Sequence, residues 1–185
     1  MSDPADTQRL IGDIIRLGTI DSVDRAGATC RVRIGDLISG DVPWLAPRAG
    51  PTRIWSPPAI GEQCLLLCPE GDTLAGVVLP GLFSNANPAP SAADLDLVEF
   101  ADGARIAYDA NAHALTALLP DGATVTIAAP GGITLHADVT IEGKLAVTGT
   151  IDADGEVTGQ GIGLSAHQHD KTQPGGGRSG TPVQP

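Results

Sequence analysis

The pattern of apolar and polar residues changes several times along the 185-residue chain. Near the start, apolar residues recur at helical spacing between residues 6 and 17. Asp6 or Thr7 can cap this segment and Gly18 follows it, so a short helix is predicted over residues 6–17. The apolar residues are Leu10, Ile11, Ile14, Ile15 and Leu17.

From residue 19 to residue 82 the pattern becomes that of short strands. Within 29–34, for example, Cys30, Val32 and Ile34 alternate with polar residues, so every second side chain can face a core. Five short strands in so little chain predict a small barrel of the OB type. The predicted strands are 19–23, 29–34, 42–45, 63–68 and 73–79.

A β meander is predicted after a linker at 83–93, which is rich in Asn, Pro and small residues. The dipeptides Asp102-Gly103 and Asp121-Gly122 are typical of tight turns between antiparallel strands. The predicted strands are 95–100, 105–108, 113–118 and 124–127.

The most regular pattern is a six-residue repeat, apolar-x-apolar-x-Gly-x, between residues 133 and 161. Each unit predicts one minimal strand and a turn, with the glycine in a backbone conformation closed to other residues. The first apolar position is held by Ile133, Val139, Leu145, Ile151 and Val157, the second by Leu135, Ile141, Val147, Ala153 and Gly159, and the glycines are Gly143, Gly149, Gly155 and Gly161.

These hexads are too few to bury their own core. A single-chain β-helix uses three hexads per coil, so about five units would give fewer than two coils and leave most Ile and Val exposed. Three chains, each supplying one side of a triangle, would close the core and leave no free sheet edge. The predicted fold is therefore mainly β: an N-terminal OB-type barrel followed by an intertwined trimeric β-helix shaft, to which the histidine pair described below adds a metal-bound apex. The predicted parts are a helix at 1–18, the barrel at 19–82, the linker at 83–93, the meander at 94–130, the shaft at 131–164, and the apex and tail at 165–185.

The composition narrows the choice of function. A net charge of −11 disfavours binding to nucleic acid or to anionic membranes. The chain has three cysteines, Cys30, Cys64 and Cys68. Because their number is odd and the N-terminal stretch is polar, they are predicted to be reduced thiols in a protein made in the cytosol. Cys64 and Cys68 lie in or beside an apolar run and are interpreted as core residues, with half of a metal site as the alternative. No apolar run is long enough to span a bilayer.

Two of the four histidines form a candidate metal site. His167 and His169 are two residues apart, so in an extended backbone both imidazoles point the same way. In a monomer the pair is a weak site or simply part of a solvated tail. Around a threefold axis the pair becomes six imidazoles, which suit an octahedral iron(II)-like ion better than tetrahedral zinc. His113 and His136 are interpreted as surface residues of strands.

This order of parts resembles baseplate assembly protein V, the central spike of contractile-tailed Mu-like phages. The most specific segments are the hexads between Ile133 and Gly161 and the run 166–170, with Gly175–Gly177 beyond it. The resemblance implies a homotrimer whose OB-type domains attach to the baseplate hub and tail tube. It also implies one Fe²⁺ per trimer at an apex ligated by His167 and His169. Family members can also hold calcium or chloride in the shaft, but no motif here places such ions.

The resemblance implies a mechanical function in the virion. The spike would sit at the tip of the tail baseplate after assembly in the host cytoplasm, and sheath contraction would drive it through the host outer membrane. No enzyme activity and no nucleic-acid partner are expected. A spike of a secretion system or bacteriocin particle remains an equal alternative. An OB domain that binds nucleic acid, a hexad acyltransferase and a cell-wall hydrolase are weaker alternatives.

Overall fold

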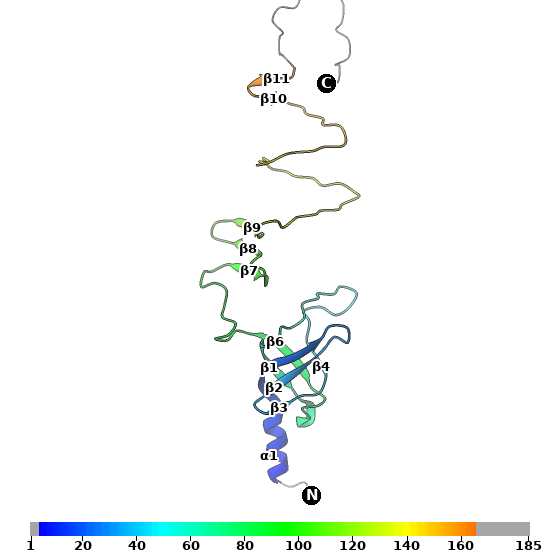
Figure 1. Ribbon diagram of the computed structural model, residues 1–185, viewed down its shortest axis with the longest axis vertical. Helices are drawn as coiled ribbons and strands as arrows, with labels where there is room; N and C mark the ends of the chain where they lie inside the picture. The colour runs from blue at the N-terminus through cyan, green and yellow to red at the C-terminus, as the bar shows by residue number, and fades with distance from the viewer. Residues whose placement is uncertain (1–3, 166–185) are drawn as a thin grey trace, which may run out of the picture. The chain divides into compact units, whose positions relative to one another are not determined.

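A computed structural model describes residues 4–165, and the chain divides into two compact units, Met1–Thr126 and Ile127–Pro185. The described part is mainly β, with one α-helix and one short 3-10 helix (Figure 1). The six-part division expected from the sequence stays a prediction. In chain order the elements are α1 (Pro4–Asp13), β1 (Ile15–Asp24), β2 (Thr29–Ile34), β3 (Leu37–Ile38), β4 (Val42–Pro43), β5 (Gln63–Leu67), η1 (Pro69–Gly71), β6 (Val77–Leu82), β7 (Asp96–Glu99), β8 (Arg105–Asp109), β9 (Ala114–Leu118), β10 (Thr158–Gly159) and β11 (Ile162–Gly163).

A six-stranded antiparallel sheet forms the first part of the chain. Its order is β3-β2-β1-β5-β6, and β4 pairs separately with β2. Just after β4, a parallel bridge joins Trp44 to Val78 of β6, and the Leu45 N–H donates to the Val78 carbonyl at 2.8 Å. The two ends of the sheet therefore approach each other as in an OB domain, but the strand ladders do not form a closed barrel.

One small apolar core lies inside this sheet. The alternation predicted for 29–34 is confirmed, because β2 spans these residues and buries Cys30 and Val32. The interpretation of the three cysteines as core residues is also confirmed, since all three are free and buried. The core cluster consists of Ile20, Cys30, Val32, Val42, Cys64, Leu66, Cys68 and Val78.

The predicted helix end at Gly18 is wrong. Helix α1 ends at Asp13, and β1 begins at Ile15 and runs straight through Gly18. Residues Ile15–Thr19 pair with β5 in an antiparallel ladder, and this pairing makes them a strand in spite of their helical spacing. Gly18 is needed because a Cβ there would collide with the Val32 side chain and lie 2.8 Å from the Arg33 carbonyl oxygen. Its role is close strand packing, not helix termination.

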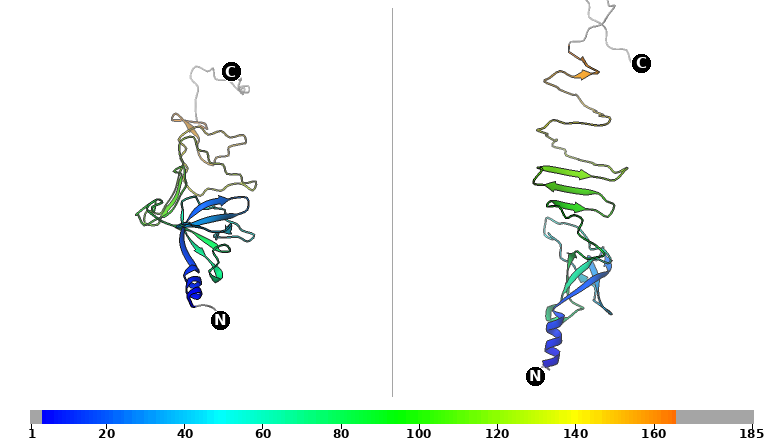
Figure 2. Two further views of the ribbon diagram at one scale, coloured as in Figure 1. Left: turned by 60° about the horizontal axis from the view of Figure 1, so that its bottom comes forward. Right: turned by 90° about the vertical axis from the view of Figure 1, so that its left-hand side faces the viewer.

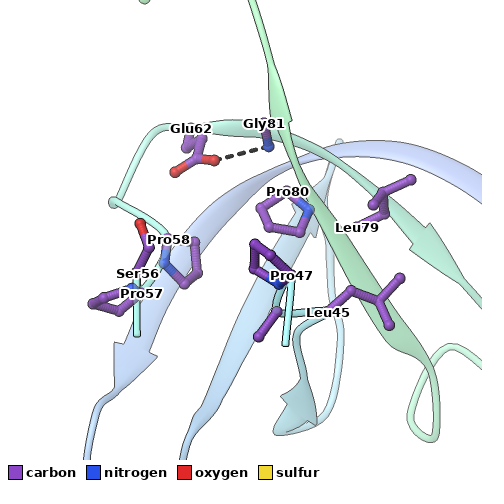
Figure 3. A pocket seen from close by; sticks show the side chains of 10 residues that line it. Leu45, Pro47, Ser56, Pro57, Pro58, Glu62, Leu79, Pro80 and Gly81 are labelled. Carbon is purple, nitrogen blue, oxygen red and sulfur yellow. Dashed lines mark hydrogen bonds between the residues drawn. The ribbon is translucent and has the colours of Figure 1, made fainter. Parts of the chain in front are cut away.

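The last strand of this sheet is shifted from its predicted position at 73–79. Strand β6 covers Val77–Leu82, and one extra residue bulges out of its pairing with β5 around Pro80 and Gly81. Proline is tolerated because β6 is an edge strand, and Gly81 supplies a positive φ of 90°. Both carboxylate oxygens of Glu62 accept backbone hydrogen bonds here, one from Ala59 and the other from Gly81, each at 2.8 Å. Figure 3 shows the hydrogen bond between Glu62 and Gly81. Glu62 thus ties the preceding loop to the bulge.

A separate three-stranded antiparallel sheet follows, in the order β7-β8-β9 (Figure 2). This confirms the meander for three of its four predicted strands. The predicted strand 124–127 is wrong, because these residues have no strand pairing. His113 is not in a strand either: it lies in the turn before β9 with a φ of 53°.

In the second unit, β10 and β11 are the only strands within residues 127–165, and they form a hairpin. The hexads before the hairpin have an extended backbone that bends at 142–143, 148–149 and 154–155. These bends are six residues apart and fall on the glycines, so the predicted spacing of strand and turn is present. Within the described residues, these extended pieces form no hydrogen-bonded ladder with one another, so they are not β-strands.

Candidate functional site

The hexad segment leaves its apolar side chains in solvent. Within residues 133–156, no backbone–backbone hydrogen bond joins the pieces to one another. Extended backbone with unpaired polar groups and apolar side chains is unfavourable in water, since both need partners. Within the described single chain, both the main chain and the apolar side chains of this segment therefore lack partners. The exposed fractions include Ile133 59%, Leu135 67%, Val139 59%, Ile141 52%, Leu145 62%, Val147 47% and Ile151 68%.

The glycines of the repeat do not all share one conformation. Gly143 and Gly161 have positive φ values of 153° and 79°, as predicted. Gly149 and Gly155 do not, so the prediction is wrong for these two. An added Cβ at Gly149 or Gly155 would have nothing within 4 Å in the single chain.

One face of the β7-β8-β9 sheet is also apolar and uncovered. The ladders place Val98 beside Ile106, and Tyr108 beside Leu115, so all four side chains lie on the same face. Each is at least 44% exposed. A three-stranded sheet needs a covered apolar face to be stable, so this sheet too is incomplete as a monomer.

A third apolar surface, which was not predicted from the sequence, lies on the outer face of the first sheet. Two rows of directly paired residues cross β1, β5 and β6 on the face opposite the core. Their side chains are exposed or half-buried, with Ile15 58%, Leu17 56% and Leu79 39% exposed. We call this the outer apolar face; its rows are Ile15–Leu67–Val77 and Leu17–Leu65–Leu79. Ile15 and Leu17 belong to this face because they lie in β1, whereas the sequence had predicted a helix there.

The predicted metal ligands His167 and His169 lie outside the described residues. Within residues 4–165, no group of three or more His, Cys, Asp and Glu side chains could hold an ion. The same residues contain no helix long and apolar enough to cross a bilayer. His113 and His136 are both exposed, as expected for surface residues.

Two arginines of β2, which a nucleic-acid-binding OB domain could offer to phosphates, are paired with carboxylates. Arg31 donates two hydrogen bonds to the carboxylate of Asp41, at 2.7 and 2.9 Å, and Arg33 pairs with Asp21. The hydrogen bonds from Arg31 lower the pKa of Asp41 below its usual value, so the pair stays ionised. Trp44, the more buried of the two tryptophans, packs against the core and contacts the Trp55 ring at a centroid distance of 5.6 Å.

A proline-rich pocket in the OB-like sheet lacks a free acid or base. It is lined by Leu45, Ser56 and Leu79, by four prolines and by Glu62 (Figure 3). Because both oxygens of Glu62 already accept main-chain hydrogen bonds, the carboxylate is engaged in holding the loop. The four prolines are Pro47, Pro57, Pro58 and Pro80.

The three buried cysteine thiols have low reactivity. Burial, with a contribution from Glu62, raises the pKa of Cys30 and of Cys64 to about 11. Burial also raises the pKa of Cys68. A protonated buried thiol is a poor nucleophile. Among the described residues, Cys64 and Cys68 are not joined by further His, Cys, Asp or Glu side chains that would complete a metal site.

Comparison with known proteins agrees with these features. Residues 16–83 match the family model for the type VI secretion system/phage-baseplate injector OB domain. The chain is also 32% identical to the spike protein of Escherichia phage P2 over 204 aligned residues, which cover 95% of each chain. The match spans the OB-like sheet, the meander and the exposed hexads together. The chain therefore belongs to the baseplate assembly protein V family of phage tail spikes.

Proposed function

We propose that three copies of this chain form the central spike of a contractile tail baseplate and that the spike punctures the host outer membrane mechanically. The observation that carries this proposal is the hexad segment, whose extended pieces and exposed apolar residues lack partners within one chain. Three chains would pair their free edges and bury the apolar positions. The product is a trimeric β-helix with no loose edge along its length.

The work of such a spike is mechanical. Force from sheath contraction is transmitted along a stiff, narrow shaft, and no bond in the host is broken chemically. The engaged carboxylate of Glu62 and the protonated core thiols agree with a role that is not enzymatic. An equivalent spike in a phage-derived secretion or bacteriocin particle would use the same mechanism.

The OB-type domain is proposed to attach the spike to the baseplate hub and tail tube. The outer apolar face is the part of this domain best suited to a permanent contact. It lies on a sheet and is built from six Ile, Leu and Val side chains without a charge. Such a face is typical of stable protein interfaces.

The apex is proposed to be held by one Fe²⁺, with His167 and His169 of each chain as ligands. The donor set fits, because six imidazole nitrogens around one axis suit an octahedral ion. A bound ion would hold three chain ends at one point and couple their folding to metal binding. Calcium or chloride in the shaft has no residues here that argue for it.

The proposal is tested by light scattering and metal analysis of the untagged protein. We expect a mass near three times 18.7 kDa and about one iron per three chains. Replacing both histidines, His167→Ala with His169→Ala, should remove the iron and leave the trimer, because the shaft buries most of the interface. A monomeric wild-type protein would refute the spike, whereas a metal-free trimer would refute only the apex.

A further inference from the structure

We propose that Glu156 is a positioning residue for the apex: its carboxylate holds Ser165 and thereby fixes where the His167–His169 segment leaves the shaft. This inference rests on the apex described under the proposed function. Glu156 itself was not singled out by any sequence pattern, since it occupies an ordinary polar position of the last hexads.

The carboxylate of Glu156 closes the base of the final hairpin. One oxygen accepts the Ser165 backbone N–H at 2.9 Å, and the other accepts the Ser165 hydroxyl. Nearby, the Leu164 N–H donates to the Val157 carbonyl at 2.9 Å. The chain is thus held from both sides at residues 164 and 165, immediately before the proposed ligands.

The hairpin itself has a defined geometry. Strands β10 and β11 pair through Thr158 with Gly163 and Gly159 with Ile162. The two residues between them, Gln160 and Gly161, both have positive φ, at 51° and 79°, as in the tight turns that match the twist of a hairpin. The turn fixes the register, and the register brings Ser165 back beside Glu156.

Gly163 provides the space that the carboxylate occupies. A Cβ at residue 163 would lie 2.8 Å from Cδ and from one oxygen of Glu156. Any side chain there would push the carboxylate away from Ser165. The hydrogen bonds from Ser165 also lower the pKa of Glu156, so the group is ionised at neutral pH and accepts at both oxygens.

A metal site gains affinity when the residues around its ligands hold them in place. The Glu156–Ser165 contact does not touch the ligands themselves. It orders the main chain at residue 165, two residues before His167. In a trimer the same contact occurs three times, so that three chain ends would approach the axis in the same direction.

The test uses the full-length trimer and four variants. Glu156→Ala removes the acceptors, and Glu156→Gln keeps an acceptor for the Ser165 N–H while losing the charge. Gly163→Ala displaces the carboxylate but leaves it charged. The matched control is Glu142→Ala, an exposed glutamate of the same segment for which the described residues provide no hydrogen-bond partner.

Two measurements are made on each protein. Hydrogen exchange of the peptide around residues 158–166, in metal-free protein, reports the clamp alone. The rate of iron loss to a chelator reports the apex. We expect Glu156→Ala and Gly163→Ala to exchange faster and to lose iron about 10-fold faster, with unchanged trimer mass, and Glu156→Gln to lie close to wild type.

The outcomes separate the inference from the function on which it rests. Unchanged exchange in Glu156→Ala overturns the clamp, and faster exchange with unchanged iron release overturns its role at the apex. Glu156→Gln behaving like Glu156→Ala would show that charge, not hydrogen bonding, matters and would also overturn it. If wild type holds no iron, the proposed apex fails, while the exchange experiment still decides whether Glu156 orders residue 165.

Discussion

At the scale of single residues, the cysteines illustrate how burial sets chemistry. Cys30 and Cys64 both lie in the core of the first sheet. Burial, which removes water from the thiols, is the main reason why the pKa of each is raised to about 11. Cys30 alternates with polar residues and Cys64 lies in an apolar run, and both patterns correctly predicted burial. The pKa values depend on packing, which removes water from both thiols, and for Cys30 also on Glu62, which the fold brings near from another part of the chain.

These thiols predict a pH dependence of stability. When the thiols are exposed in the unfolded chain, their pKa is near the ordinary thiol value of 9.0. Between pH 9 and about 11 the unfolded chain therefore releases protons that the folded chain retains. The free energy of unfolding should therefore be steady below pH 9 and fall above it. Urea unfolding at pH 8, 9 and 10 measures this. The Cys30→Ala, Cys64→Ala double variant should show a shallower fall, and an identical slope would contradict the prediction.

At the scale of elements, the boundary between α1 and β1 was decided by pairing. Ile14, Ile15 and Leu17 fit the apolar side of a helix, yet they are equally good strand residues. Pairing of β1 with β5 is a contact between residues far apart in the chain, and a local pattern cannot register it. The shift of β6 to Val77–Leu82 has the same origin, since the bulge at Pro80 and Gly81 is stabilised by Glu62 from another segment.

Two glycines test this boundary. Gly18→Ala should destabilise the protein by about 1–3 kcal/mol, because its Cβ meets Val32 and the Arg33 carbonyl oxygen. Gly12→Ala, in α1 with nothing within 4 Å, should instead stabilise by about 0.5–1 kcal/mol. Denaturant unfolding followed by circular dichroism measures both. Equal effects of the two changes would indicate that Gly18 is not packed between strands.

At the scale of the whole molecule, the hexads have no strand partners and the apolar sheet faces have no cover within the described single chain, and the proposed trimer would supply both. An acidic residue in the shaft should prevent assembly. Ile141→Asp is expected to reduce the mass in light scattering from trimer towards monomer, because a buried unpaired charge in each chain is costly. Thr140→Asp, at the polar position beside it, is the control and should remain trimeric. Dissociation by neither change would argue against burial of Ile141.

The outer apolar face makes a separate prediction about attachment. Leu17→Glu should leave the trimer intact but reduce incorporation of the spike into baseplates, measured by its amount in purified particles. Leu37→Glu, an exposed apolar position on β3 outside this face, is the matched control. If Leu17→Glu instead breaks the trimer, the face packs between copies of the chain and does not contact the hub.

The sequence alone determined the features that depend on neighbours in the chain. The hexad period with its bends at the glycines, the buried alternation of β2 and the turns of the meander all follow from local spacing. Tertiary structure decided where α1 gives way to β1, where β6 bulges, which face of the sheet is apolar, and that Glu156 reaches Ser165. Each of these depends on a strand or side chain brought close from another part of the sequence, and a one-dimensional pattern carries no record of that pairing.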